Sequence, residues 1–265
     1  MSVSNTADIE YTLLLLSDGN LPTGAFVASS GLESYLAHGF GAASDRQSMM
    51  PFVRSSLSAY AASALTFVHN VHQLVLRHLA SDVTLDEVLI ELHTIDELYH
   101  TTLLNEPARR ASKAQGVALL TLYTKGLSSP DAQRQATLVD KFKLLVRKGS
   151  TPGHLPTCWA ILTAVIALPA DRTAHLHLFL HVRGLLSAAI RLNALGPYAA
   201  QQLLAHDVRP LIEREMDLHR ARLAEAAREK DTTARVLATN PACTWPLGEI
   251  LAARHDLQHS RIFNS

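Results

Sequence analysis

The stretch Pro156–Leu168, PTCWAILTAVIAL, is apolar on nearly every side of a helical wheel. A helix that is hydrophobic all round lies either in the core of a protein or in a membrane. The longest apolar run here, Cys158–Ala170, is interrupted by Thr163 and Pro169 and falls short of the ~20 residues that a membrane span needs. The stretch therefore predicts a buried core helix, and nothing else in the chain predicts a membrane segment.

On both sides of this stretch, apolar residues recur at helical rather than alternating spacing. No Asn-Gly or Asp-Gly turn joins two strand-like runs. Thr84 and Glu87 have the spacing of a capping box, and Pro107 suits the first turn of a helix. A further helix is predicted over Phe26–His38, ending at Gly39. We expect an all-α fold: a single domain of about ten helices over residues 1–235, then a C-terminal tail with a short helix over residues 236–265.

The charge balance excludes several classes of protein. Of the 265 residues, 24 are Lys or Arg and 24 are Asp or Glu, so the net charge is zero, while 48% are apolar. A duplex nucleic-acid binder carries a basic surplus, and a disordered chain combines low hydrophobicity with high net charge. Charged residues make up only 18% of the chain and concentrate in the helix after Ala205. Much of the remaining surface is therefore expected to be lightly charged, and a large core is the simplest account of the apolar residues.

The two cysteines, Cys158 and Cys243, lie far apart and form neither a disulfide framework nor a CxxC metal pair. The first residues, Met1–Asn5, lack the basic start of a signal peptide. A reducing, cytoplasmic location is the simplest interpretation.

Fourteen histidines make a metal site the first chemical hypothesis. His177 and His181 are spaced to share one helix face, and Glu97 with His100 forms a single Glu-x-x-His. However, no HExxH is present, and a di-iron bundle needs two Glu-x-x-His motifs with further carboxylates. Most of these histidines are expected to be surface or hydrogen-bonded residues. An α-helical metalloenzyme that uses His177/His181 or Glu97/His100 stays open as an alternative.

Other catalytic signatures are missing from the sequence. It contains no GxxxxGK[ST] phosphate loop, no dinucleotide fingerprint and no GxSxG nucleophile elbow. Cys158, beside Trp159 in the apolar stretch, suits a core position better than a nucleophile. The residues alone give no positive sign of an enzyme and no set of metal ligands.

One stretch is hard to explain as structure alone: Leu21–Glu33, LPTGAFVASSGLE. A solvent-exposed loop does not need Phe26, and a helix does not favour Gly31. In this position the string resembles the N-terminal signature of the UreF family of urease accessory proteins. The family often has glycine in place of Ala25 and tyrosine or histidine in place of Ala28, so a partner contact made by those side chains is in doubt here.

Later segments match the same family in the same order along nearly the whole chain. They are Arg109–Ser112 (RRAS), Gly153-His154, Ala188–Pro197 (AAIRLNALGP) and the ending His255–Ser265 (HDLQHSRIFNS). The resemblance implies a non-catalytic all-α protein that dimerises, binds the UreD (UreH) accessory protein and recruits the GTPase UreG. The assembly delivers nickel to apo-urease. The missing phosphate loop is consistent with this role, because GTP hydrolysis belongs to the partner.

The resemblance also implies which residues bind partners. No cofactor is expected to bind stably, and nickel would pass only transiently through the assembly. The tail, with Arg261 and Phe263, is expected to become ordered on binding UreD. A generic helical scaffold with no link to urease is the remaining alternative. The implied partner-binding residues are Pro22, Gly24, Phe26, Gly31, Glu33, Arg110, Ser112, Arg191, Leu195, Gly196, His255, Asp256, Arg261 and Phe263.

Overall fold

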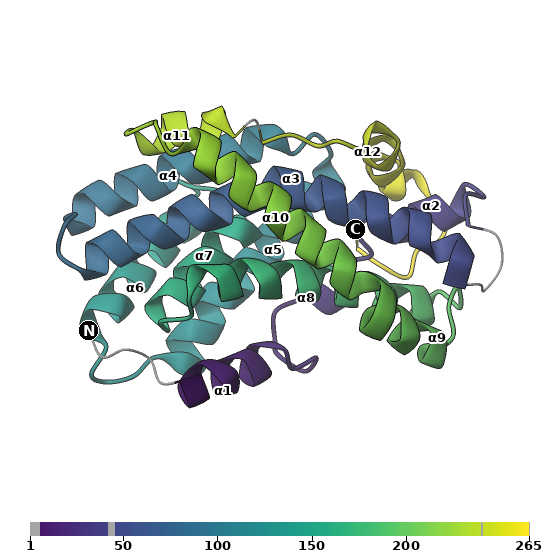
Figure 1. Ribbon diagram of the computed structural model, residues 1–265, viewed down its shortest axis with the longest axis horizontal. Helices are drawn as coiled ribbons and strands as arrows, with labels where there is room; N and C mark the ends of the chain where they lie inside the picture. Colours follow the sequence, from purple (N-terminus) through teal and green to yellow (C-terminus); the bar gives the residue numbers. More distant parts are fainter. Residues whose placement is uncertain (1–5, 42–45, 240, 265) are drawn as a thin grey trace.

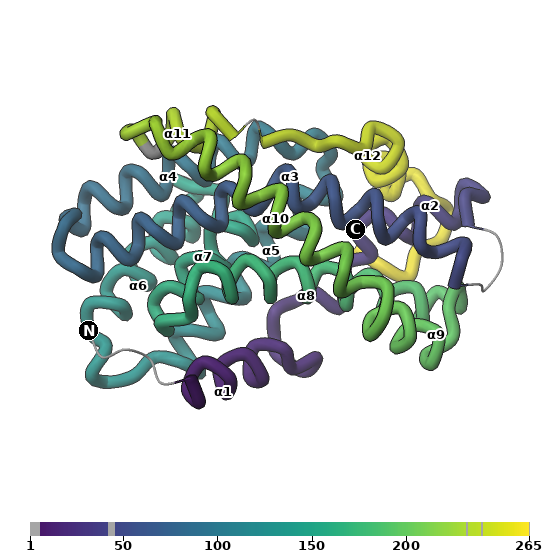
Figure 2. Tube along the Cα trace, in the orientation of Figure 1, coloured from purple at the N-terminus to yellow at the C-terminus, as the bar shows by residue number. Residues whose placement is uncertain are grey.

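The computed structural model describes residues 6–41, 46–239 and 241–264, and the regular structure in these residues is entirely helical (Figures 1 and 2). Ten α-helices have seven residues or more, which confirms the expected all-α fold. None of the described helices is long and apolar enough to cross a membrane. The α-helices are α1 (Thr6–Leu16), α2 (Leu32–Ala37), α3 (Arg46–Leu79), α4 (Leu85–Thr102), α5 (Glu106–Leu122), α6 (Gln133–Arg147), α7 (Leu155–Val165), α8 (Ala170–Arg191), α9 (Pro197–Gln202), α10 (Val208–Ala226), α11 (Thr232–Ala238) and α12 (Pro246–Ala253).

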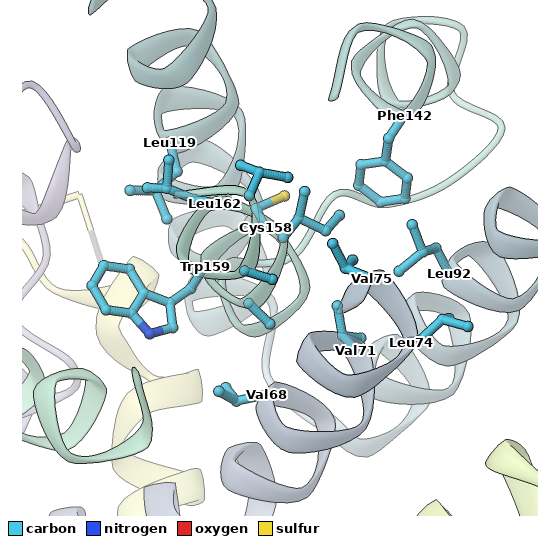
Figure 3. Close-up of a cluster of buried hydrophobic side chains, with 14 of the residues drawn as sticks. Val68, Val71, Leu74, Val75, Leu92, Leu119, Phe142, Cys158, Trp159 and Leu162 are labelled. Carbon is cyan, nitrogen blue, oxygen red and sulfur yellow. The ribbon is translucent and has the colours of Figure 1, made fainter. Parts of the chain in front are cut away.

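The predicted core helix is α7, and every residue from Pro156 to Val165 is buried. It packs chiefly against α3 and α5. Figure 3 shows Cys158 and Trp159 of α7 among leucines and valines of the neighbouring helices. Burial raises the pKa of the Cys158 thiol well above its ordinary value, so this cysteine is a packing residue.

A single glycine allows α5 to approach the chain that enters α7. A Cβ added to Gly116 would lie 2.1 Å from the Gly153 carbonyl oxygen and 3.0 Å from the Cys158 sulfur. No larger residue fits there unless the backbone moves.

Two hydrophobic clusters share the interior. The first surrounds α7 and includes the C-terminal half of α3. The second lies between the N-terminal half of α3, α8 and α10, and includes Leu32, Leu251 and Phe263. Helix α10 crosses α3 in Figure 1, and α12 with the tail lies beside α2. The long helices α3 and α8 therefore connect both clusters.

Several local predictions can be checked directly. The capping box is confirmed, because Thr84 N–H donates to Glu87 Oε2 and Glu87 N–H donates to Thr84 Oγ1. The predicted helix over Phe26–His38 is wrong in its first half. The chain forms a 3-10 turn at Ala25–Val27, and α2 begins only at Leu32. Ser30 and Gly31 both have positive φ, at 51° and 84°, and this conformation stops a helix from continuing through them.

Candidate functional site

The C-terminal tail is held by one carboxylate at the start of α2. Glu33 is only 7% exposed and accepts three hydrogen bonds. The donors are Ile262 N–H at 2.6 Å, Phe263 N–H at 3.1 Å and His255 Nε2 at 3.1 Å. Glu33 therefore ties two parts of the tail to the N-terminal signature segment, and we call this arrangement the Glu33 clamp.

Backbone contacts extend the clamp. Asn264 N–H donates to the Val27 carbonyl oxygen at 2.9 Å, so the end of the tail runs beside the 3-10 turn. A Cβ on Gly31 would lie 3.3 Å from Ala252 Cβ on α12. Because it has no side chain, Gly31 can adopt the positive φ and also leaves room for the close approach of α12. Gly24 also has positive φ, at 70°, but no atom would crowd a Cβ there.

Arg191, in the last turn of α8, lies between two aromatic rings. Its guanidinium carbon is 3.8 Å from the centre of the Phe26 ring and 4.2 Å from that of Phe263. Phe26 is 67% exposed, whereas Phe263 is only 3% exposed. Such stacking is favourable for a cation. Burial lowers the pKa of Arg191 from its ordinary value, and no carboxylate in the described residues forms an ion pair with it.

A charged network covers the outer side of the tail. Arg110 on α5 donates to both carboxylate oxygens of Asp256, at 3.0 and 2.9 Å, and to the Asn264 carbonyl oxygen at 2.6 Å. Arg261 donates to Asp256 at 2.5 Å. The hydrogen bonds from Arg110 are the largest cause of the lowered pKa of Asp256. These groups are solvent-exposed, so their contribution to stability is small.

Ser112, another predicted site residue, belongs instead to a buried joint between α5 and α7. Its Oγ accepts from Leu155 N–H at 3.0 Å and lies 3.1 Å from His154 Nδ1. His154 Nε2 is 2.9 Å from His100 Nδ1. Burial, followed by the charge of His100, lowers the pKa of His154 to about 3. Ser112 is 9% exposed and holds helices together inside the molecule.

Asp96 completes this joint, and the sequence analysis gave it no role. It accepts from Thr151 Oγ1 at 3.0 Å, Gly153 N–H at 2.6 Å and His154 N–H at 3.1 Å. Burial raises the pKa of Asp96, while the hydrogen bonds oppose that shift. In the sequence, the signal for a buried role of Asp96 was an acidic residue next to Ile95 on the apolar face of α4. We call Asp96, His100, Ser112 and His154 the α5–α7 joint.

The remaining predicted residues lie outside both arrangements. Leu195 is 3% exposed and belongs to the second hydrophobic cluster. Gly196 precedes α9 on the surface, and Pro22 is exposed in the loop before the 3-10 turn. The clamp thus brings together Phe26, Gly31, Glu33, Arg191 and the tail, but not these three residues.

The histidine pairs that motivated the metalloenzyme alternative are engaged otherwise. His177 Nε2 lies 2.8 Å from the Tyr60 hydroxyl, and His181 Nε2 lies 3.0 Å from Ser56 Oγ. Among the residues that the structure describes, no group of three or more His, Cys, Asp or Glu side chains could hold a metal ion. The geometry gives the metalloenzyme no site.

Comparison with known proteins identifies the family of this chain. The family model described as UreF matches residues 43–206. Urease accessory protein 6 of Cryptococcus neoformans var. grubii is 38% identical over 100% of this chain and 99% of its own length. Urease accessory protein UreF of an Arthrobacter strain is 28% identical, covering 97% of both chains. Urease accessory protein F of rice is 27% identical over 94% of this chain and 82% of its own. The family model and the full-length relative together show that the chain belongs to the UreF family of urease accessory proteins.

Proposed function

We propose that this protein is a non-catalytic adaptor in urease maturation. It binds a UreD (UreH)-like accessory protein and recruits a UreG-like GTPase, and the assembly inserts nickel into apo-urease. It acts in the cytoplasm as a homodimer, and nickel is cargo of the assembly rather than a resident cofactor of this chain.

The observation that carries the proposal is the surface around the Glu33 clamp. Segments far apart in the sequence meet there and present exposed apolar side chains: Phe26 at 67%, Val27 at 45%, Leu257 at 75% and Ile262 at 65% exposure. Asp256 and Arg261 lie at the edge of this patch. Apolar side chains surrounded by charged groups are typical of a protein-protein interface.

The clamp gives the tail a different role from the one expected. The tail was expected to become ordered on binding a partner, but the described part of it is already packed against the body of the single chain. His255 and Phe263 are buried, so they shape the surface from within, whereas Phe26 and Ile262 face outward. A preformed surface spares the partner the entropic cost of ordering the tail.

A pull-down with the UreD-like and UreG-like proteins tests the proposal. Ile262→Asp places a charge in the exposed patch, and Ile90→Asp places the same charge on α4. The two side chains are 65% and 66% exposed, so the two substitutions are matched in exposure and in the charge they add. We expect Ile262→Asp to lose the UreD-like partner and Ile90→Asp to retain it.

Urease activity in a deletion strain separates the adaptor from a generic scaffold. The proposal is supported if the deletion strain loses urease activity and if the unmodified chain and Ile90→Asp restore that activity, whereas Ile262→Asp does not. Full urease activity in the deletion strain would rule out a role in maturation. If both variants capture the partners equally well, the interface does not lie at the clamp.

A further inference from the structure

A cavity of about 350 Å³ separates the two hydrophobic clusters. Residues of α3, α5, α7 and α8 line it, and the loop before α2 together with α12 covers it. Cavities of this size, with mainly apolar walls and a few polar groups, are typical sites for small molecules.

One wall of the cavity is a stack of four rings. The ring centroids of Trp159 and His177 are 5.7 Å apart, those of His177 and Tyr60 are 5.2 Å apart, and those of Tyr60 and His181 are 4.1 Å apart. The angles between the ring planes are 28°, 30° and 12° in the same order. Burial lowers the pKa of His177 to about 3 and that of His181 to about 4, so both imidazoles are uncharged at neutral pH. Their Nε2 atoms are hydrogen-bonded to Tyr60 and Ser56. Within the stack, neighbouring rings cover the faces of His177 and Tyr60, so the wall offers uncharged ring edges, and His181 ends the stack on the side of Gly184.

A stripe along α8 continues from this stack. His181, Gly184, Ser187 and Arg191 recur at helical spacing, and all four are partly exposed while most of the residues between them are buried. A Cβ on Gly184 would meet no atom within 4 Å. A glycine inside a helix costs about 0.5–1 kcal/mol relative to alanine. Here no close packing requires it, and it leaves open space above the helix.

Arg191 supplies a cation at the end of the stripe. Its Nε is 3.5 Å from the Ser187 carbonyl oxygen, so the side chain points back along α8 toward Gly184. The guanidinium carbon lies over the Phe26 and Phe263 rings, and rings accept no strong hydrogen bond, so N–H groups of Arg191 remain for a charged acceptor.

The other charged groups that line the cavity have partners. Asp18 accepts from Asn20, and Glu249 accepts from Asn105 at 2.6 Å. Arg183 donates to the Ser17 carbonyl oxygen. Arg191 is the cation at the end of the α8 stripe, and no carboxylate in the described residues pairs with it, so it can recognise an anionic group.

We propose that this cavity binds a small planar aromatic carboxylate, with its ring over Gly184 against His181 and its carboxylate on the N–H edge of Arg191. The ring and the carboxylate fit between these groups because the guanidinium lies about one helical turn beyond Gly184. This site goes beyond the adaptor role, and it shares Phe26 and Arg191 with the region of the Glu33 clamp, so it is tested on the free chain.

Calorimetric titration of the purified full chain tests the site with 2-naphthoate as probe. We expect saturable binding at one site, and about tenfold weaker binding of the uncharged 2-naphthalenemethanol, which lacks the charge-assisted hydrogen bonds. Arg191→Gln should abolish the difference between the two probes. Gly184→Leu, which fills the groove, should reduce binding of both by about tenfold or more. Gly184→Ala serves as the folded control and should retain binding.

An NMR titration of the unmodified protein covers the case in which Gly184→Leu does not fold. Ring-current shifts at the Gly184 amide and the Trp159 indole N–H would support the site. The inference is overturned if the protein shows no saturable binding at about 1 mM probe. It is also overturned if a folded Gly184→Leu variant binds the probe as tightly as the unmodified protein. Shifts that appear only at distant residues would mean that the probe binds as an adventitious additive only, which likewise overturns it.

Discussion

The α5–α7 joint and the Glu33 clamp use similar chemistry in opposite settings. In both, one carboxylate accepts three hydrogen bonds and a histidine lies beside it: Asp96 with His154 in the joint, and Glu33 with His255 in the clamp. The joint connects helices inside the molecule. The clamp fixes a tail whose neighbouring side chains face solvent. Both carboxylates are buried, Asp96 at 0% and Glu33 at 7% exposure, so the two arrangements differ in what surrounds them: packed helices in the joint, and exposed tail side chains in the clamp.

The largest effect is expected at the backbone contact of the joint. Gly116→Ala would force a Cβ against the Gly153 carbonyl oxygen, so the free energy of unfolding should fall by about 2–4 kcal/mol. Gly184→Ala, the same change in an open helical position, should instead raise it by about 0.5–1 kcal/mol. Urea denaturation of both variants measures the difference. Equal effects at the two glycines would mean that α5 and α7 do not approach closely.

Acid should weaken the joint before it weakens the charged network on the outer side of the tail. The pKa of His154 is lowered to about 3 by burial, below the ordinary 6.5 of an unfolded chain. A lowered histidine pKa contributes stability that is complete above about pH 6.5 and is lost as the pH falls toward 3. Asp256 has a lowered carboxylate pKa, so its contribution is lost only below about pH 4.

Unfolding free energies between pH 7 and pH 4.5 check this order. The native protein should lose stability steadily, and His154→Asn should flatten that slope. An unchanged slope in His154→Asn would assign the acid sensitivity to the other buried histidines.

Glu33→Gln should loosen the tail and leave the helical body folded. The amide keeps one acceptor oxygen in place of two and removes the charge, so the expected local cost is about 1–3 kcal/mol. Hydrogen exchange at the Ile262 and Phe263 amides should accelerate about tenfold or more, while exchange in α7 stays the same. Global unfolding of Glu33→Gln would show instead that the clamp is part of the core.

The smallest effect is expected on the outer side of the tail. Asp256→Asn removes an exposed acceptor of Arg110 and Arg261, and exposed pairs contribute about 0–1 kcal/mol. The melting temperature should shift by no more than a few degrees, and added salt should reduce the difference from the native protein. A salt-independent loss of several degrees would contradict the surface character of this network.

The sequence predicted best where the physics is local. The periodicity of Pro156–Leu168 identified the buried helix, and Thr84 with Glu87 identified a helix start, because the partners lie within a few residues. The break at Ser30 and Gly31 had one local signal, because a helix does not favour glycine. The close approach of Ala252 to Gly31 could not be read from the sequence, since the two residues are more than two hundred positions apart.

The candidate site was predictable to the same extent: the sequence indicated single residues, but not the contacts between distant segments. The family resemblance implied that Glu33 and Phe263 are site residues. It did not show that the Glu33 carboxylate accepts a hydrogen bond from the Phe263 N–H. Asp96 was missed because its hydrogen-bond donors come from residues 151–154, which only the packing of α4 beside α7 brings to it. Arg191 was identified as a candidate, yet its two rings come from opposite ends of the sequence.

The cavity between the two hydrophobic clusters has a mechanical consequence. Pressure favours states that eliminate internal void volume, and this molecule concentrates such a volume along α8. The region around α7 lacks that slack, because α5 touches its entry backbone at Gly116. Compression should therefore act on the two halves unequally. The spacing of α5 and α7 at Gly116 should therefore change least under pressure, while the open space along α8 can shrink.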